Sequence, residues 1–154
     1  MNGFSEQWLA EYKARTAKLR VKPPLPDRIE FMIPRLLKLP NKTIGTHWSE
    51  SYRQRSQLRT MLEPILAPYI EHVPMERAKV TVTRFSCGAT RPDWDNLAAG
   101  AKPLIDLLLV ASKTHPRSFG IIQDDGPTQV IPIMFAERVM KRVEQRTEVI
   151  IERI

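Results

Sequence analysis

Four carboxylates occupy two short stretches of a chain whose formal net charge is +7. Asp93 and Asp95 lie in RPDWDN, and Asp124 and Asp125 lie in QDDG. Two aspartates two residues apart in extended backbone point to the same side, and at about 4 Å their charges repel by roughly 4 kcal/mol at an effective dielectric constant of 20. A divalent cation removes this repulsion, and Mg²⁺ prefers a few carboxylates together with water and phosphate oxygens. The alternative is a turn in which Asp95 or Asn96 caps the helix that follows.

The residues after RPDWDN are expected to form a helix to about Ser112. If this helix starts at Asp95, then Lys102 and Asp106 follow seven and eleven residues later, and both fall within about 20° of one line on the helix surface. A lysine on the same face as two carboxylates can contact a phosphate or stabilise a leaving oxygen. The alternative is a surface ion pair between Lys102 and Asp106, which contributes roughly a few tenths of a kcal/mol. Pro103 removes one backbone hydrogen bond and can kink the helix.

The second acidic stretch follows an apolar segment in GIIQDDG, which predicts a short strand that runs into a turn. Because adjacent strand residues point to opposite faces, only one of Asp124 and Asp125 is expected to face a site. A plain Asp-Gly turn is the alternative. Together, the acidic stretches, the lysine and the basic chain indicate a metal-dependent phosphodiesterase. In such an enzyme the metal binds the scissile phosphate, activates water and stabilises developing charge.

The composition limits the class of protein. The 154 residues suit one compact domain, and a hydrophobic content of 42% is enough for a core. The 24 Lys and Arg against 17 Asp and Glu are typical of a protein with a polyanionic partner, here expected to be nucleic acid. The single Cys87 cannot form an internal disulfide, which fits a reducing compartment. Since no apolar run has the length of a membrane span and the first residues lack a signal-peptide core, a soluble cytoplasmic protein is expected.

Hydrophobic periodicity predicts a mixed α+β domain of interleaved helices and strands. Residues 129–145 are ambiguous between strand and helix. Pro34 cannot donate to a β-ladder, so the strand before it is expected at a sheet edge. The expected elements are a helix over 5–19, that edge strand over 29–33, a helix over 48–69, a strand over 78–87, the helix from the acidic loop to about Ser112, a short strand at 120–123 and a last strand over 146–154.

Five arginines are candidate contacts to DNA phosphates, which would make DNA binding depend on salt. Three of them lie on the helix expected over 48–69, on faces other than its apolar side. The five are Arg53, Arg55, Arg59, Arg84 and Arg91.

The combination PDWDNLAAGAKPLIDLL, then GIIQDD about a dozen residues later, then a closing RTEVIIERI resembles the RusA family of Holliday-junction resolvases. The resemblance covers roughly residues 28–154. It implies a RusA-like endonuclease domain over 25–154, with 1–24 as an N-terminal helical extension and linker. The implied fold is a small mixed sheet packed with helices, in a homodimer. The implied activity is Mg²⁺-dependent cutting of four-way DNA junctions by paired strand cuts, in DNA recombination and repair in a bacterial or phage-infected cell.

The resemblance also implies roles for single residues. Asp93, Asp95 and Asp125 match the three essential acids, which are expected to hold Mg²⁺, or Mn²⁺ in its place, and Lys102 matches the catalytic lysine. The shorter family pattern has its lysine four residues after the second aspartate, where this chain has Ala99. The supporting positions are Asn96 as a loop or cap residue, Asp106 as the acid on the same helix, and Asp124 beside the third essential acid.

Two other functions remain open on the sequence. The first is a non-catalytic DNA-binding or phage assembly protein on the same scaffold, which would bind DNA without cutting it and ignore Mg²⁺. The second is a nuclease for flaps or other branched DNA. A metal-independent hydrolase is not expected, because the three histidines have no evident nucleophile partner and Cys87 lies in no catalytic motif.

Overall fold

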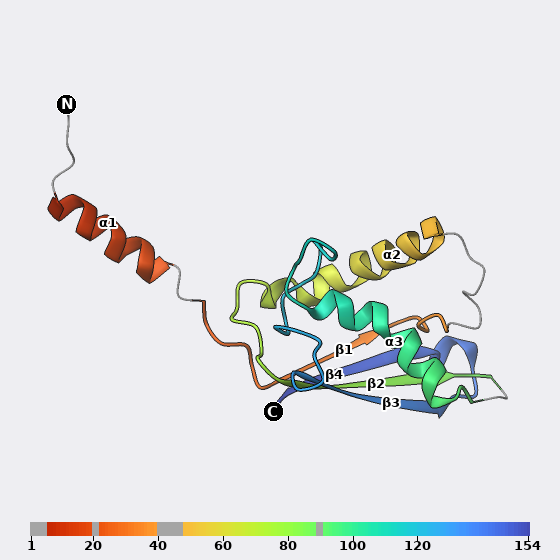
Figure 1. Cartoon of the computed structure of the whole chain (residues 1–154). Coiled ribbons are helices and arrows are strands. Elements are labelled where there is room, and N and C mark those ends of the chain that lie inside the picture. The colour runs from red at the N-terminus through yellow and green to blue at the C-terminus, as the bar shows by residue number, and fades with distance from the viewer. Residues whose placement is uncertain (1–5, 20–21, 40–47, 89–90) are drawn as a thin grey trace.

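The structure is a computed structural model that describes residues 6–19, 22–39, 48–88 and 91–154. It has the mixed α+β composition predicted from the sequence (Figure 1). Its elements in chain order are α1 (Glu6–Leu19), β1 (Arg28–Ile33), α2 (Trp48–Leu66), the 3₁₀ turn η2 (Ala67–Tyr69), β2 (Ala78–Ser86), α3 (Trp94–Leu108), β3 (Val130–Arg138), the 3₁₀ turn η3 (Arg142–Glu144) and β4 (Arg146–Arg153).

The four strands form one mixed sheet in the order β1-β4-β2-β3. Strand β4 is antiparallel to both β1 and β2, whereas β2 and β3 are parallel. A parallel pair needs a long crossover connection, and here α3 and the segment 109–129 provide it. Strand β1 lies at one edge, as the proline after it predicted, and β3 lies at the other.

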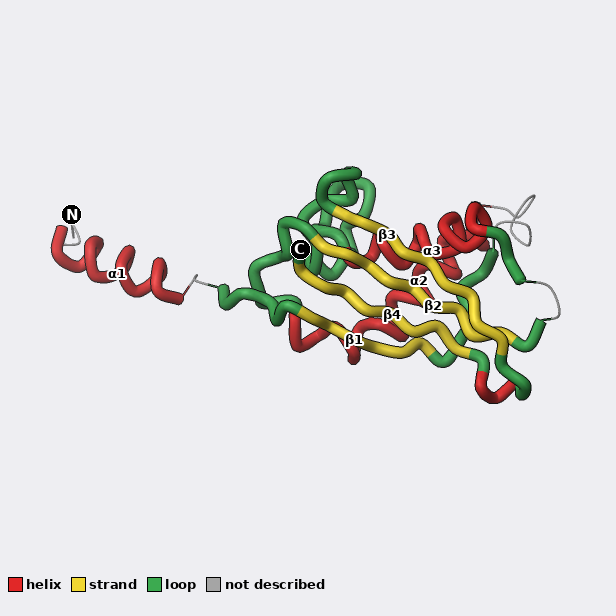
Figure 2. Tube along the Cα trace, turned by 90° about the horizontal axis from the view of Figure 1, so that it is seen from below, coloured by secondary structure: helices red, strands yellow, loops and turns green. Residues whose placement is uncertain are grey.

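One face of the sheet packs against α2 and α3, and the buried side chains alternate along β1, β2 and β4 as half-buried strands require. Val80 and Ile151 of the sheet and Leu62, Leu104 and Leu108 of the helices are fully buried in this core. Figure 2 shows the other face without a covering helix, and Figure 1 shows α1 standing away from the sheet. No helix in the described part of the chain is both long and apolar enough to cross a membrane.

The strand directions divide the molecule into two ends. Ile33 pairs with Thr147, Phe85 with Arg146, and Ser86 with Arg138, so β1, β2 and β3 all finish where β4 begins. Helix α3 begins eight residues after β2, at the same end. The segment before β3 lies at the other end, because Gln123 N donates to Met75 O and Ala78 N donates to Gln129 O.

The connection after α3 differs from the sequence prediction. Helix α3 finishes at Leu108 instead of about Ser112, because Leu109 is extended with φ −72° and ψ 168°. Residues 120–123 form no strand; Ile122 makes only isolated bridges to Met75 and Leu109. Residues 129–145, which were ambiguous, form the strand β3 and the turn η3.

Gly120 explains why the predicted short strand does not form. Its φ of +72° turns the chain back onto the end of α3, where Phe119 N donates to Leu107 O and Ile121 N donates to Leu108 O, at 2.7 and 2.8 Å. This left-handed conformation costs an L-residue with a Cβ roughly 1–2 kcal/mol, whereas asparagine tolerates it better.

We therefore expect Gly120→Ala to lower the free energy of unfolding by about 1 kcal/mol, and Gly120→Asn to lower it less. No atom lies within 4 Å of a Cβ built at Gly120, so a steric clash does not contribute. Urea unfolding of the two variants checks the order. Equal stability of the alanine variant and the wild type would contradict the strained conformation.

Candidate functional site

The start of α3 carries the first acidic pair. Asp93 is the N-cap of α3, and its Oδ1 accepts a hydrogen bond of 3.0 Å from the backbone N of Asn96. Asp95 lies in the first turn, and both aspartates are exposed. Negative side chains are favoured here because the first backbone N–H groups of a helix are unpaired and carry partial positive charge. The capping residue is thus Asp93, not Asp95 or Asn96. The extended geometry assumed for the pair holds only for Asp93, because the helix begins at Trp94.

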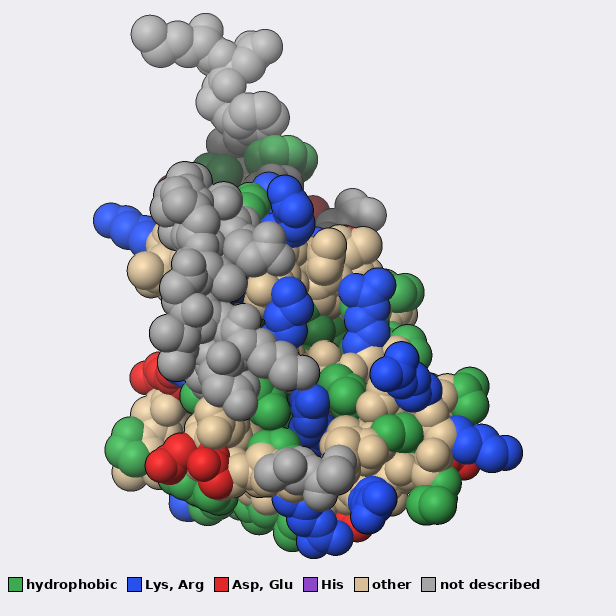
Figure 3. Space-filling view, turned by 90° about the vertical axis from the view of Figure 1, so that its right-hand side faces the viewer, with side chains coloured by type: hydrophobic (Ala, Val, Ile, Leu, Met, Phe, Trp, Pro, Cys, Tyr) green, Lys and Arg blue, Asp and Glu red, His purple; other side chains and the backbone are tan. Residues whose placement is uncertain are grey.

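This acidic pair lies at a strongly basic end of the molecule. Figure 3 looks onto the end where β1, β2 and β3 finish, and Lys and Arg side chains are spread across it with fewer acidic ones. We call the exposed cations that follow these strands the basic end: Arg35, Lys38, Arg91, Arg138, Lys141 and Arg142.

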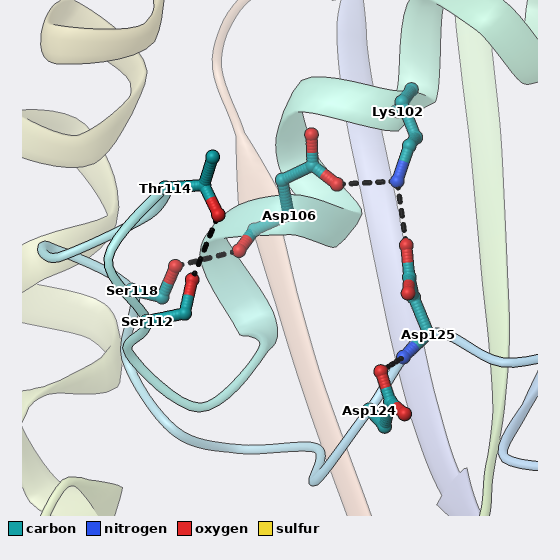
Figure 4. A network of polar contacts seen from close by, with 7 residues as sticks. All are labelled: Lys102, Asp106, Ser112, Thr114, Ser118, Asp124 and Asp125. Carbon is teal, nitrogen blue, oxygen red and sulfur yellow. Dashed lines mark hydrogen bonds and ion pairs between the residues drawn. The ribbon is translucent and has the colours of Figure 1, made fainter.

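A second network lies further along α3 and centres on Lys102. Its Nζ donates to Asp106 Oδ1 at 2.6 Å and to Asp125 Oδ2 at 2.7 Å (Figure 4). Asp124 supports the loop, since its Oδ1 accepts from the backbone N of Asp125 at 2.8 Å. The Asp106 side chain is only 10% exposed, whereas that of Lys102 is 55% exposed. The ion pair between Lys102 and Asp106, which the sequence offered as the alternative to a catalytic lysine, is present, and Asp125 joins it from a distant loop.

The contacts of this network shift two pKa values. Burial lowers the pKa of the Lys102 ammonium, but the hydrogen bonds to Asp106 and Asp125 outweigh burial and leave the pKa above its ordinary value. The hydrogen bond from Lys102 holds the pKa of the Asp125 carboxyl below its ordinary value, against partial burial, which acts in the opposite direction. Both shifts favour the charged forms of Lys102 and Asp125 at neutral pH, so these two side chains form a stable ion pair.

The structure does not bring the three predicted metal ligands together. Lys102 is seven residues after Asp95, which separates them by about 10 Å along the helix axis, and Lys102 reaches toward the next turn. Asp125 is hydrogen-bonded to Lys102 and therefore lies beside this later part of α3. Among the described residues, which include all four aspartates, no three histidine, cysteine, aspartate or glutamate side chains gather closely enough to hold a metal ion.

A single Mg²⁺ shared by Asp93, Asp95 and Asp125 therefore does not fit this arrangement. The pair at the start of α3 fits a Mg²⁺ that also binds a substrate phosphate, since this ion commonly uses one or two carboxylates plus water and phosphate oxygens. One oxygen of Asp93 is committed to the helix cap, and its second oxygen makes no hydrogen bond within the described chain.

The five arginines predicted to contact DNA have different surroundings. Arg91 is exposed at the basic end, and Arg53 and Arg55 are exposed on α2. Arg59 is held by its Nε bond of 3.0 Å to Arg117 O and by an ion pair with Glu63 at 3.3 Å.

Arg84 is the least available of the five for DNA. Its Nη1 donates to Leu37 O at 2.5 Å, its Nε is buried without a partner among the described residues, and burial lowers its pKa. A direct contact between Arg84 and a phosphate would require this segment to move.

Sequence reasoning missed two groups of residues. Arg138, Lys141 and Arg142 join the basic end only because β3 is parallel to β2, although the run ERVMKRVEQR already signalled positive charge. Ser118, whose Oγ donates to Asp106 O at 2.7 Å, had no sequence signal, since the contact depends on the turn at Gly120. The charges and contacts of the described residues are the basis for assigning a function, because no protein-family model and no curated protein sequence matches this chain.

Proposed function

We propose that the chain is a Mg²⁺-dependent endodeoxyribonuclease that cuts branched DNA, with the four-way junction as its preferred substrate. The observation that carries the proposal is the exposed pair Asp93 and Asp95 at the start of α3, set within six exposed cations at one end of the sheet. Carboxylates in such surroundings favour a site that receives both a cation and a phosphate backbone. The RusA-like motif order in the sequence supports the same activity.

The residues have separate roles in this proposal. Asp93 and Asp95 would hold Mg²⁺, which supplies polarisation of the scissile phosphate and a nucleophile at neutral pH. The Asn96 backbone N–H fixes the orientation of Asp93 by donating to Oδ1. Exposed cations such as Arg91 and Arg142 bind phosphates on either side and set the position of the strand. Lys102 holds the Asp124–Asp125 loop against α3 by its hydrogen bond to Asp125, so this loop is fixed to the helix that carries the acidic pair.

A homodimer would explain paired cuts, because a twofold axis relates two identical sites to two symmetric strands. We propose the uncovered face of the sheet as its contact surface. Met32 on edge strand β1 and Ile131 and Phe135 on edge strand β3 are 49, 43 and 50% exposed on that face, and exposed apolar surface of this kind is common at protein–protein contacts. Sedimentation of the wild type against Phe135→Glu tests this, with a monomeric variant as the expected outcome.

Cleavage of a panel of labelled DNAs by the wild-type protein tests the proposed activity. In Mg²⁺ we expect two symmetric cuts in a four-way junction, much slower cutting of linear duplex, and no cutting when EDTA replaces the metal. Tight binding without cleavage in either Mg²⁺ or Mn²⁺ would contradict the proposal and favour the non-catalytic DNA-binding protein. Faster cutting of a flap than of the junction would assign the enzyme to other branched DNA.

The basic end predicts a specific salt dependence. We expect Arg91→Gln to weaken junction binding and to reduce the slope of log K against log salt concentration by about 0.9 for each subunit bound, because each subunit loses one phosphate contact. Arg77→Gln is the matched control, since Arg77 is exposed but directly precedes β2, at the opposite end of the sheet. Binding isotherms at several salt concentrations in EDTA give both slopes. Equal slopes for the two variants would remove the basic end as the binding surface.

A further inference from the structure

A cavity of about 310 Å³ lies between α2 and the loop that follows α3, away from the acidic pair. Its walls are tied together by hydrogen bonds: Arg59 Nε on α2 donates to Arg117 O, and Ser118 Oγ donates to Asp106 O. Arg59 also lies over the Phe119 ring, 5.3 Å from its centroid. The cavity is therefore built into the fold, and its volume is at the lower end of the range for small-ligand pockets.

The polar groups around this cavity have complementary signs. Three arginines line it, Arg55, Arg59 and Arg117, and Arg55 and Arg117 make no ion pair with any described residue. One acidic residue also lines it, Asp106. Lys102 bonds only Oδ1 of this carboxylate, and Figure 4 shows the second oxygen turned away from Lys102. A ligand for this cavity should thus have an anionic group for the arginines and a hydrogen-bond donor for Asp106.

Apolar and aromatic surface completes the cavity. Leu107 and Pro116 line its wall, and Tyr52, which is 59% exposed, lines it from α2. Aromatic side chains at such positions bind nucleobases by stacking. A flat base with an amino group, joined to a phosphate, meets all three requirements at once.

We propose that this cavity binds one unpaired nucleotide, with the amino group of its base donating to Asp106 and its phosphate near Arg55 and Arg117. The inference that this nucleotide belongs to a DNA substrate rests on the proposed nuclease function. The inference that the cavity binds a single nucleotide is independent of that function. Adenine and cytosine present an exocyclic amino group as donor. Thymine presents a ring N–H between two carbonyl oxygens that the carboxylate repels, so it should bind less well.

Calorimetric titration of the full chain in EDTA tests the proposal without any cleavage. The probes are dAMP, dCMP, dTMP, deoxyribose 5-phosphate and inorganic phosphate. We expect dAMP or dCMP to bind about tenfold more tightly than dTMP and than the two phosphates without a base, since one hydrogen bond to a charged group is lost in each of these. Equal affinity for inorganic phosphate and for the nucleotides would overturn the proposal, because only an anion site would remain.

Two cavity variants and one control variant locate the binding. Arg117→Gln and Tyr52→Ala change exposed side chains, and each should weaken dAMP or dCMP binding several-fold, whereas Arg77→Gln, at an exposed residue that does not line the cavity, should not. Unchanged affinity in both cavity variants would overturn the assignment to this cavity. A duplex with one unpaired adenine should compete with dAMP better than a fully paired duplex does; equal competition would exclude DNA as the source of the nucleotide. Since Asp95→Asn should retain nucleotide binding, failure of nuclease activity and failure of this site are separate results.

Discussion

Asp95→Asn should reduce Mg²⁺-dependent cleavage of a four-way junction by about a hundredfold or more, whereas Asp125→Asn should keep the rate within the same order of magnitude as the wild type. The contrast follows from the positions of the two carboxylates. Asp95 is exposed in the first turn of α3. Asp125 is hydrogen-bonded at 2.7 Å to Lys102, which follows Asp95 by about 10 Å along the helix axis. Even outer partners of metal ligands change affinity or activity by roughly 10- to 100-fold, so loss of a ligand should reach at least the upper value.

Single-turnover rates across a Mg²⁺ titration measure both effects. Asp27→Asn is the matched control, because Asp27 is an exposed aspartate next to β1 whose side chain pairs only with Arg153 within the described residues. Asp93→Asn provides a second test of the pair, since asparagine caps a helix as well as aspartate and the fold should survive. If Asp125→Asn lost as much activity as Asp95→Asn at saturating Mg²⁺, Asp125 would have to join the pair during the reaction.

Lys102→Met should lower the free energy of unfolding at pH 7 by about 2 kcal/mol. Removing one partner of a fully buried ion pair costs roughly 3–5 kcal/mol, because the other charge stays in a poorly solvated place. The value is smaller here because the Lys102 side chain is 55% exposed and solvent screens part of the interaction. The Asp106 carboxylate, with a side chain only 10% exposed, would be the charge left without its cation.

The pH dependence of this effect has a definite sign. In the wild type, Lys102 lowers the pKa of Asp125. This pair therefore stabilises the fold fully at pH values above the unfolded-state pKa of about 3.9. The stabilisation is lost as the pH falls through the lower folded-state pKa. The pKa of Lys102 is raised, so its contribution is complete below about pH 10.4 and is lost as the pH rises through the higher folded-state value. In Lys102→Met the cause of the lowered Asp125 pKa is gone, so the deficit against the wild type should shrink as the pH falls below about 3.9.

Urea unfolding at pH 7 and at about pH 3, which is below the unfolded-state pKa of an aspartate, measures both quantities. Lys113→Met is the control for loss of a lysine, because Lys113 is exposed in the loop after α3. The double variant Lys102→Met with Asp106→Leu should recover much of the lost stability, since it removes the isolated charge as well. A Lys102→Met protein as stable as the wild type at both pH values would mean that the network contributes nothing to the fold.

The sequence by itself determined most of the local structure. The alternation of Val80 and Val82 with Thr81 and Thr83 was enough to predict β2, because a strand with one buried face has a period of two residues. The same local logic predicted α2, the edge position of β1 and the ion pair between Lys102 and Asp106. These features depend on neighbours within about one helical turn or on a single proline.

Tertiary structure decided β3 and the path after α3. Strand β3 contains Pro132, which a central strand would not tolerate, and it is stable only because β2 pairs with its other edge. The segment at Gly120 had strand composition but found its hydrogen-bond partners at the end of α3, through a backbone conformation that sequence periodicity does not encode.

The site shows the same division. Helical periodicity gave the shared face of Asp95, Lys102 and Asp106 correctly, but an angle around a helix says nothing about the distance along it. Only the fold decided that Asp125 contacts Lys102 and not the acidic pair. Asp125 follows Lys102 by 23 residues, and its loop is positioned by backbone hydrogen bonds to the chain at the start of β2. Local sequence sets the direction of a side chain, whereas contacts between distant segments set which charges meet.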